Sequence, residues 1–256
     1  MEKVRYEEML PHEIVARRAK FPAAFIALGG LEWHGEHLAV GNDALKGEKL
    51  CELAAARSGG FAFPTLWYGE PRVSHLMEVN HDADGRIRTT MGFKAEKFAL
   101  DYFGDSPQEQ ERFYQHLLRH VLVQMNTLEM KAVCLLCGHY PIASWAQPAV
   151  EEFNAAFADT RAFAAIEPGY AGNSPDAGGD HAAKWETSYL WHLRPDCVDM
   201  GVFRGREGEP LIGVHGHDPR TEASAEVGRK GVELIVAGMV EKAKELVRLA
   251  SAGGIG

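Results

Sequence analysis

The sequence has little that would place the protein in a membrane, on nucleic acid or in an oxidising compartment. No apolar run approaches ~20 residues, the length of a membrane-spanning helix, and the opening MEKVRYEEML has no signal-peptide core. Basic residues are too few for a nucleic-acid or anionic-membrane partner, because 27 lysines and arginines face 36 acidic residues and leave a charge of −9. Four cysteines do not make a disulfide framework. We therefore expect a cytoplasmic protein with no nucleic-acid or membrane partner.

The chain alternates between predicted strands and predicted helices. Strands are expected at 23–28, 61–67, 132–137 and 161–168, with short strand pieces at 198–203 and 210–214. Helices are expected at 6–20, 44–57, 106–129, 144–157, 181–193 and 221–250, and Ser106 and Asp180 are the expected N-caps. Residues 71–93 and 169–179 are predicted loops. This order predicts a single α/β domain over residues 1–256, with a mostly parallel sheet covered by helices on both faces.

The stretch LGGLEWHGEHLAVGND, from Leu28 to Asp43, concentrates polar residues directly after a predicted strand. Glu32 and His34 are two positions apart, so on an extended chain their side chains project to the same side. Asp43 follows at a spacing that lets the loop turn back. Carboxylate and imidazole groups together suit Zn, Mn or Fe, so we expect a divalent metal site. The alternative is a polar loop with His34 and His37 at the surface.

Two further stretches carry residues that could join this site. His139 follows the strand predicted at 132–137, and ligand sites in parallel sheets lie beyond the carboxyl ends of the strands. If the two strands are neighbours, His139 reaches the same metal as His34. His181 and Glu186 lie in the stretch GGDHAAKWETS, where a neutral histidine at a helix start could accept a proton. The alternatives are a structural histidine at a strand end and a capped, solvent-facing helix.

Cys134 and Cys137 form a CxxC motif inside the predicted strand at 132–137. Side chains three positions apart on a strand face opposite sides of the sheet, so this pair cannot easily close a disulfide. Reactive CxxC motifs instead open a helix, where the thiolate is stabilised. We interpret both residues as core thiols, and a thiol oxidoreductase remains a rival hypothesis.

The motif LEWHGEHLAVGND resembles the creatininase (creatinine amidohydrolase) family, in which Glu-x-His-Gly-x-His-Leu is followed by an aspartate. The stretches at 74–75, 137–140, 180–195 and 216–231 follow in family order. The resemblance implies a three-layer α/β/α fold, a metal-dependent amidohydrolase activity and a homo-oligomer, often a hexamer. It also assigns roles to individual residues: metal ligands at Glu32, His34, Asp43 and His139, a proton-transferring His181, and substrate contacts at Ser74, Tyr140 and Asp180.

The sequence departs from the family pattern after His139. Creatininase itself has a glutamate two positions after the ligand histidine, where this chain has Pro141, which cannot coordinate a metal. We expect one or two ions, zinc first and manganese or iron as alternatives, that activate a water to attack the carbonyl of a small amide. The expected substrate is a cyclic amide or formamide rather than creatinine, with Glu186 orienting His181 or the water. The alternative, motivated by Pro141, is a catalytically inactive metal-binding relative with a structural or sensing role.

Overall fold

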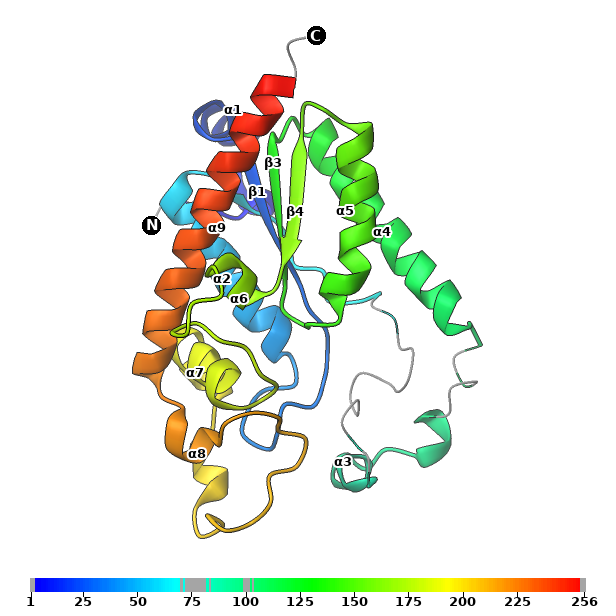
Figure 1. Cartoon of the computed structure of the whole chain (residues 1–256), viewed down its shortest axis with the longest axis vertical. Coiled ribbons are helices and arrows are strands. Elements are labelled where there is room, and N and C mark those ends of the chain that lie inside the picture. The colour runs from blue at the N-terminus through cyan, green and yellow to red at the C-terminus, as the bar shows by residue number, and fades with distance from the viewer. Residues whose placement is uncertain are drawn as a thin grey trace.

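The chain folds around a four-stranded parallel sheet flanked by helices (Figure 1). The computed structural model describes residues 3–69, 71, 82, 84–98, 102 and 104–253. Its strands are β1 (Ala23–Leu28), β2 (Phe61–Ala62), β3 (Ala132–Cys137) and β4 (Arg161–Ala165), in the order β2-β1-β3-β4. β1 and β3 pair in register along their whole length, from Ala23 opposite Ala132 to Leu28 opposite Cys137. The two loops that follow these strands therefore start side by side.

Helices cover both faces of the sheet and make a three-layer α/β/α arrangement (Figure 1). Alternate residues of β1 enter two separate cores: Ala23, Phe25 and Ala27 face one side, and Ala24, Ile26 and Leu28 face the other. The first core is shared with α2 (Asn42–Ser58), α7 (Lys184–Leu193) and α9 (Ala225–Gly253). The second is shared with α4 (Pro107–Thr127) and α5 (Ile142–Ala156). Burial on both faces explains why the strands are almost entirely apolar.

The remaining helices are short. In the described part of the chain they are the α-helices α1 (Pro11–Lys20), α3 (Arg86–Met91), α6 (Glu167–Tyr170) and α8 (Pro219–Glu222) and the 3₁₀ turns η1 (Tyr6–Glu8), η3 (Ala95–Phe98), η5 (Pro195–Cys197) and η6 (Met200–Phe203). Within the described ranges, no helix combines the length and apolar character that crossing a membrane requires.

The strands predicted at 23–28 and 132–137 have the predicted bounds, and Ser106 caps α4 with Glu109 in a capping box. Other predicted elements are wrong in extent or type. The strand predicted at 61–67 ends at Ala62, residues 198–203 contain η6 and no strand, and residues 210–214 form no regular element. Residues 86–91 form α3 inside a predicted loop. The helix predicted at 221–250 is divided at residues 223–224, between α8 and α9.

Candidate metal centre and its surroundings

The predicted site residues meet at the carboxyl ends of β1 and β3, as the parallel pairing requires. Glycine allows the closest approach there. A Cβ on Gly138 would collide with the backbone carbonyl of Asp43, so only a glycine lets the end of β3 reach the first turn of α2. This contact places His139, the next residue, beside Asp43.

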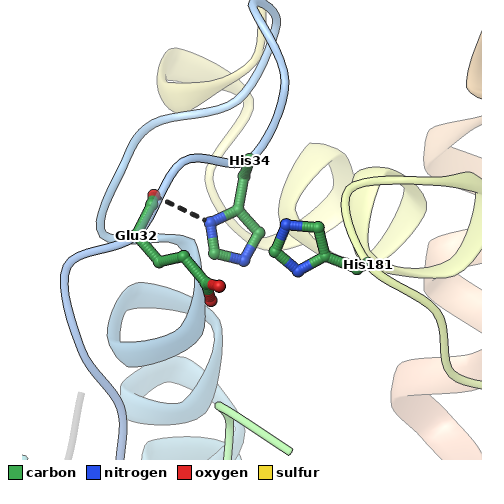
Figure 2. A group of neighbouring side chains, drawn as sticks. All are labelled: Glu32, His34 and His181. Carbon is green, nitrogen blue, oxygen red and sulfur yellow. Dashed lines mark hydrogen bonds between the residues drawn. The ribbon is translucent and has the colours of Figure 1, made fainter. Parts of the chain in front are cut away.

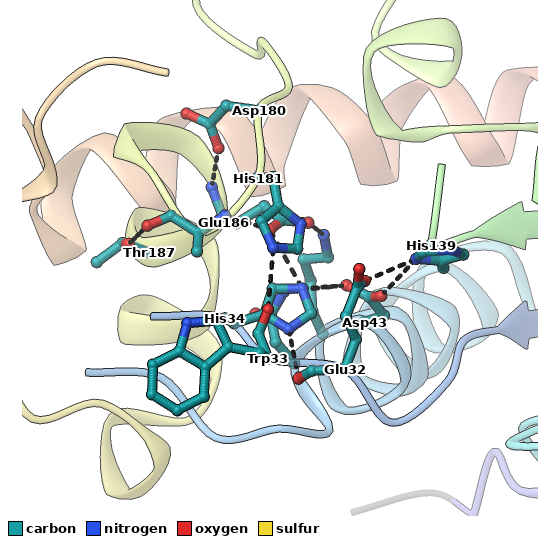
Figure 3. A network of polar contacts seen from close by, with 12 residues as sticks. Glu32, Trp33, His34, Asp43, His139, Asp180, His181, Glu186 and Thr187 are labelled. Carbon is teal, nitrogen blue, oxygen red and sulfur yellow. Dashed lines mark hydrogen bonds and ion pairs between the residues drawn. The ribbon is translucent and has the colours of Figure 1, made fainter. Parts of the chain in front are cut away.

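Asp43 lies between two histidines that approach its two oxygens from different sides (Figure 3). His34 Nε2 is 3.0 Å from Asp43 Oδ1, and His139 Nδ1 is 3.4 Å from Asp43 Oδ2. His139 Nδ1 is also 2.9 Å from Glu32 Oε2. All four side chains are buried. The residues predicted from the two loops are therefore together, with the Asp43 carboxylate shared between them.

The orientation of His34 is set by a backbone contact (Figure 2). Its Nδ1 lies 3.0 Å from the carbonyl oxygen of Glu32, and a carbonyl can only accept, so Nδ1 carries the hydrogen. In the neutral ring, the lone pair is then on Nε2, which faces Asp43. A histidine whose second nitrogen bonds a carbonyl in this way is a common arrangement for a metal ligand.

Among the described residues there are three overlapping groups of possible ligands. Within each group the ligand atoms lie within 4.8 Å of one another, and each group fits the chemistry of a divalent cation. The groups are Glu32–Asp43–His139, His34–Asp43–Glu186 and Glu32–His34–His181. Asp43 Oδ2 and His34 Nε2 are buried and form no hydrogen bond of normal geometry to the described residues, although both lie close to charged partners. Such atoms are available to a cation.

Electrostatics at the centre also suits a cation. Burial lowers the pKa of His34 and His139, but the carboxylates around them more than offset this, and their pKa values rise to about 9 and about 10. Burial would raise the pKa of Asp43, but the charge of His34 and the close approach of both histidines hold it well below its usual range. Without a metal, the two histidines therefore hold protons that supply positive charge to the surrounding carboxylates. A divalent ion would supply this charge instead, and its binding would release the protons.

His181 lies next to the group, with its ring centroid 4.6 Å from that of His34 (Figure 2). Its Nε2 is 2.9 Å from the carbonyl oxygen of Trp33, so Nε2 carries the hydrogen and the lone pair of the neutral ring is on Nδ1. Burial and the charge of His34 lower the pKa of His181 to about 4. This direction agrees with the predicted neutral ring, but the predicted position at a helix start is wrong, since α7 begins at Lys184 and His181 instead forms a β-bridge with His215.

Asp180 and Glu186 shape the start of α7 (Figure 3). The N-cap residue is Ala183, not the predicted Asp180, yet Asp180 accepts hydrogen bonds from the backbone N–H groups of Trp185 (2.8 Å) and Glu186 (3.1 Å). Glu186 Oε2 accepts the N–H of Ala182 at 2.8 Å and lies 3.5 Å from His34 Nε2. Burial raises the pKa of Asp180 to about 6. Glu186 thus connects the loop of His181 to His34.

Lys46 and Glu167 also lie at the site, and neither was predicted from the sequence. Lys46 lies one turn after Asp43 on α2, with 0% of its side chain exposed, and its Nζ is 2.8 Å from Glu186 Oε1 and 2.9 Å from Glu167 Oε1. The signal was in the sequence: Lys46 is three positions after Asp43 and four before Leu50, on the face of α2 that enters the core. A lysine at such a position needs a buried partner.

Tyr140 packs into the protein beside this lysine. Its ring centroid is 5.8 Å from Lys46 Nζ, and a Cβ on Gly179 would collide with its hydroxyl, which is buried. His37 bonds the Thr187 hydroxyl at 2.8 Å, and burial lowers its pKa to about 4. His37 is therefore neither at the surface nor in any of the three ligand groups. Ser74 lies outside the described residues.

The CxxC cysteines are core residues. Cys134 and Cys137 belong to the two different cores on opposite faces of the sheet, and both are free thiols with 0% exposure. Burial raises the pKa of Cys134 to about 12 and that of Cys137 further. A buried, protonated thiol is unreactive, which removes the structural basis for thiol redox chemistry at this motif.

Comparison with known proteins agrees with the fold. A profile of the family described as "Creatininase: Creatinine amidohydrolase" matches residues 7–243. No curated protein sequence gives a significant match. Among solved structures, "Creatininase Mn" is 19% identical with a TM-score of 0.66, and covers 95% of this chain and 98% of its own.

Two further solved structures have the same fold. "Crystal structure of creatinine amidohydrolase (creatininase)" is 20% identical, with a TM-score of 0.66 and coverage of 96% and 98%. A glutamate-to-glutamine mutant creatininase described as "Zn-Zn type" is 20% identical, with a TM-score of 0.64 and the same coverage. Because the family profile spans most of the chain, the protein belongs to the creatininase family of metal-dependent amidohydrolases.

Proposed function

We propose that the protein hydrolyses the C–N amide bond of a small molecule of the cyclic-amide or formamide type. The observation that carries this proposal is the cluster of carboxylate and imidazole groups around Asp43, at the ligand-binding edge of the sheet in a member of this family. Structures with the same fold include one described as a mutant creatininase complexed with creatine, a small molecule.

The proposed ligands are Glu32, His34, Asp43 and His139, holding one or two divalent ions. Zinc is the first candidate because imidazole and carboxylate suit it, with manganese or iron as alternatives. Zn and Mn appear in the descriptions of the similar structures. When bound, the cation supplies Lewis acidity toward the carbonyl and activates a water at neutral pH.

His181 is the proposed proton carrier. Its neutral ring has a lone pair on Nδ1, because Nε2–H is held by the Trp33 carbonyl, so it can take a proton from the attacking water. Burial lowers the pKa of His181, which favours passing that proton on to the leaving nitrogen. Glu186 acts as a positioning residue, since its hydrogen bond to the N–H of Ala182 fixes the backbone beside His181. Asp180, Tyr140 and Ser74 remain proposed substrate contacts.

The test is a metal-dependent hydrolysis assay. Purified protein, chelator-treated protein and metal-reloaded protein would be incubated with creatinine, five-membered cyclic amides and N-formyl compounds, with products followed by mass spectrometry. The proposal expects turnover of at least one class that disappears on chelation and returns with zinc or manganese. Bound metal without turnover of any class would instead favour the inactive metal-binding alternative.

The assembly and location are proposed on the family resemblance and on composition. We propose a homo-oligomer, a hexamer by family resemblance, formed by the single domain over residues 1–256 in the cytoplasm. Light scattering that shows a monomer at micromolar concentration would contradict the assembly.

A further inference from the structure

Lys46 is a buried cation beside the candidate metal site, and its ammonium group cannot act as a metal ligand. An ammonium group that loses all contact with water is costly unless carboxylates compensate it. Lys46 is compensated twice, by Glu186 at 2.8 Å and by Glu167 at 2.9 Å, and neither carboxylate is exposed by more than 2%. The ammonium is therefore fixed between two buried carboxylates on this side of the site.

The position of this charge matters because Glu186 belongs to one of the candidate ligand groups, His34–Asp43–Glu186. Its Oε1 accepts from Lys46, and its Oε2 accepts from the N–H of Ala182. Both oxygens of Glu186 are therefore already bonded, one of them by a positive charge, so a cation at this group would have to displace one of these hydrogen bonds. A divalent ion bound there would also lie close to a like charge in a dry environment, where repulsion is strong.

The other side of Asp43 is different. Within the part of the chain that the structure describes, the ion pairs of Asp43 are to His34 and His139, and its Oδ2 faces His139. In the group Glu32–Asp43–His139, two carboxylates face one imidazole. This group offers a cation two negative charges and one neutral donor.

We propose that Lys46 takes the electrostatic place of a second cation, so that the protein binds a single divalent ion at Glu32, Asp43 and His139. This inference rests on the proposed metal-dependent function, and it selects one ion where that function allowed one or two. With a single ion, His34 is no longer one of the proposed ligands: it contacts Asp43 and Glu186 and lies beside the ion. Lys46 is a positioning residue that holds Glu186 and keeps the second position empty of metal.

The experiment measures metal per chain and metal position. Chelator-treated protein would be titrated with Mn²⁺ in a calorimeter, and Mn²⁺-loaded crystals would be examined by anomalous scattering. Wild-type protein is expected to bind one ion, with one anomalous peak between Asp43 and His139. Lys46→Met is expected to bind about two ions, because Glu186 is released to the His34 side. Lys46→Arg, which keeps the charge, is expected to bind one.

Lys49→Met is the matched control. Lys49 is on the same helix, partly exposed and paired with Glu52, so its loss should leave the count at one. Two ions in the wild type, a peak on the His34–Glu186 side, or one ion in folded Lys46→Met would each overturn the inference while leaving a metal-dependent enzyme. If Lys46→Met does not fold, the wild-type peak alone decides. A wild type that binds no metal and hydrolyses nothing would remove the proposed function itself.

Discussion

The two sides of Asp43 are built from the same residue types, a histidine and a glutamate, yet they differ in charge. On one side, His139 and Glu32 meet the carboxylate with their ligand atoms 2.9 Å apart. On the other, His34 and Glu186 are 3.5 Å apart, and Glu186 is bound by the buried ammonium of Lys46. If Lys46 replaces a second ion as proposed, the residue types of a metal motif do not by themselves determine how many ions it binds, because a neighbouring buried charge engages one of its carboxylates.

The largest expected effect comes from the residue that both sides share. Asp43→Ala should reduce bound metal to background and abolish turnover, because it removes the carboxylate common to two of the ligand groups. Elemental analysis and the hydrolysis assay would measure both. Retention of one ion per chain in this variant would show that Asp43 is not a ligand.

Replacing each histidine separately tests the asymmetry directly. His139→Ala removes a proposed ligand and should weaken metal binding by more than about 100-fold. His34→Ala removes a neighbour of the ion and should weaken it by roughly 10-fold, within the usual range for an outer partner. Calorimetric titration of the two variants side by side would measure this. Equal losses would contradict a single ion on the His139 side.

His181 lies close to Glu32 and His34 and is expected to act in proton transfer. His181→Ala should lower turnover by roughly 10²–10⁴ with the metal content unchanged, the usual contribution of general acid–base catalysis. Normal turnover with the metal intact would make the proton-transfer assignment wrong. Loss of the metal would instead identify His181 as a ligand.

The smallest effect is a pH dependence of stability. His34 and His139 have raised pKa values in the metal-free protein, so their stabilising contribution is present below the unfolded value of about 6.5 and is lost as pH rises toward 9–10. The thermal unfolding temperature of chelator-treated protein should therefore decrease as the pH is raised from about 6.5 to about 8.5. In metal-loaded protein the unfolding temperature should depend less on pH, because the ion replaces the protons on these histidines. An equal decrease with pH in metal-loaded protein would contradict this replacement.

The part of the site that could be predicted from sequence is the part that follows from strand order. β1 and β3 are short apolar runs with polar residues directly after them, and parallel pairing puts Glu32 and His139 together. The strands predicted at 198–203 and 210–214 are wrong, because these short apolar runs lie outside the sheet and have no strand to pair with. Lys46 was missed because its partners, Glu167 and Glu186, are more than a hundred residues away in the sequence, so nothing local shows that its charge is balanced.

The central claim is that this cluster makes the protein a metal-dependent enzyme. Its most direct test is elemental analysis of the purified wild type beside Asp43→Ala, both prepared in the same metal-containing buffer. The account predicts one equivalent of zinc, manganese or iron per wild-type chain and background metal in the variant. Equal metal contents in the two proteins, or none in the wild type, would contradict it.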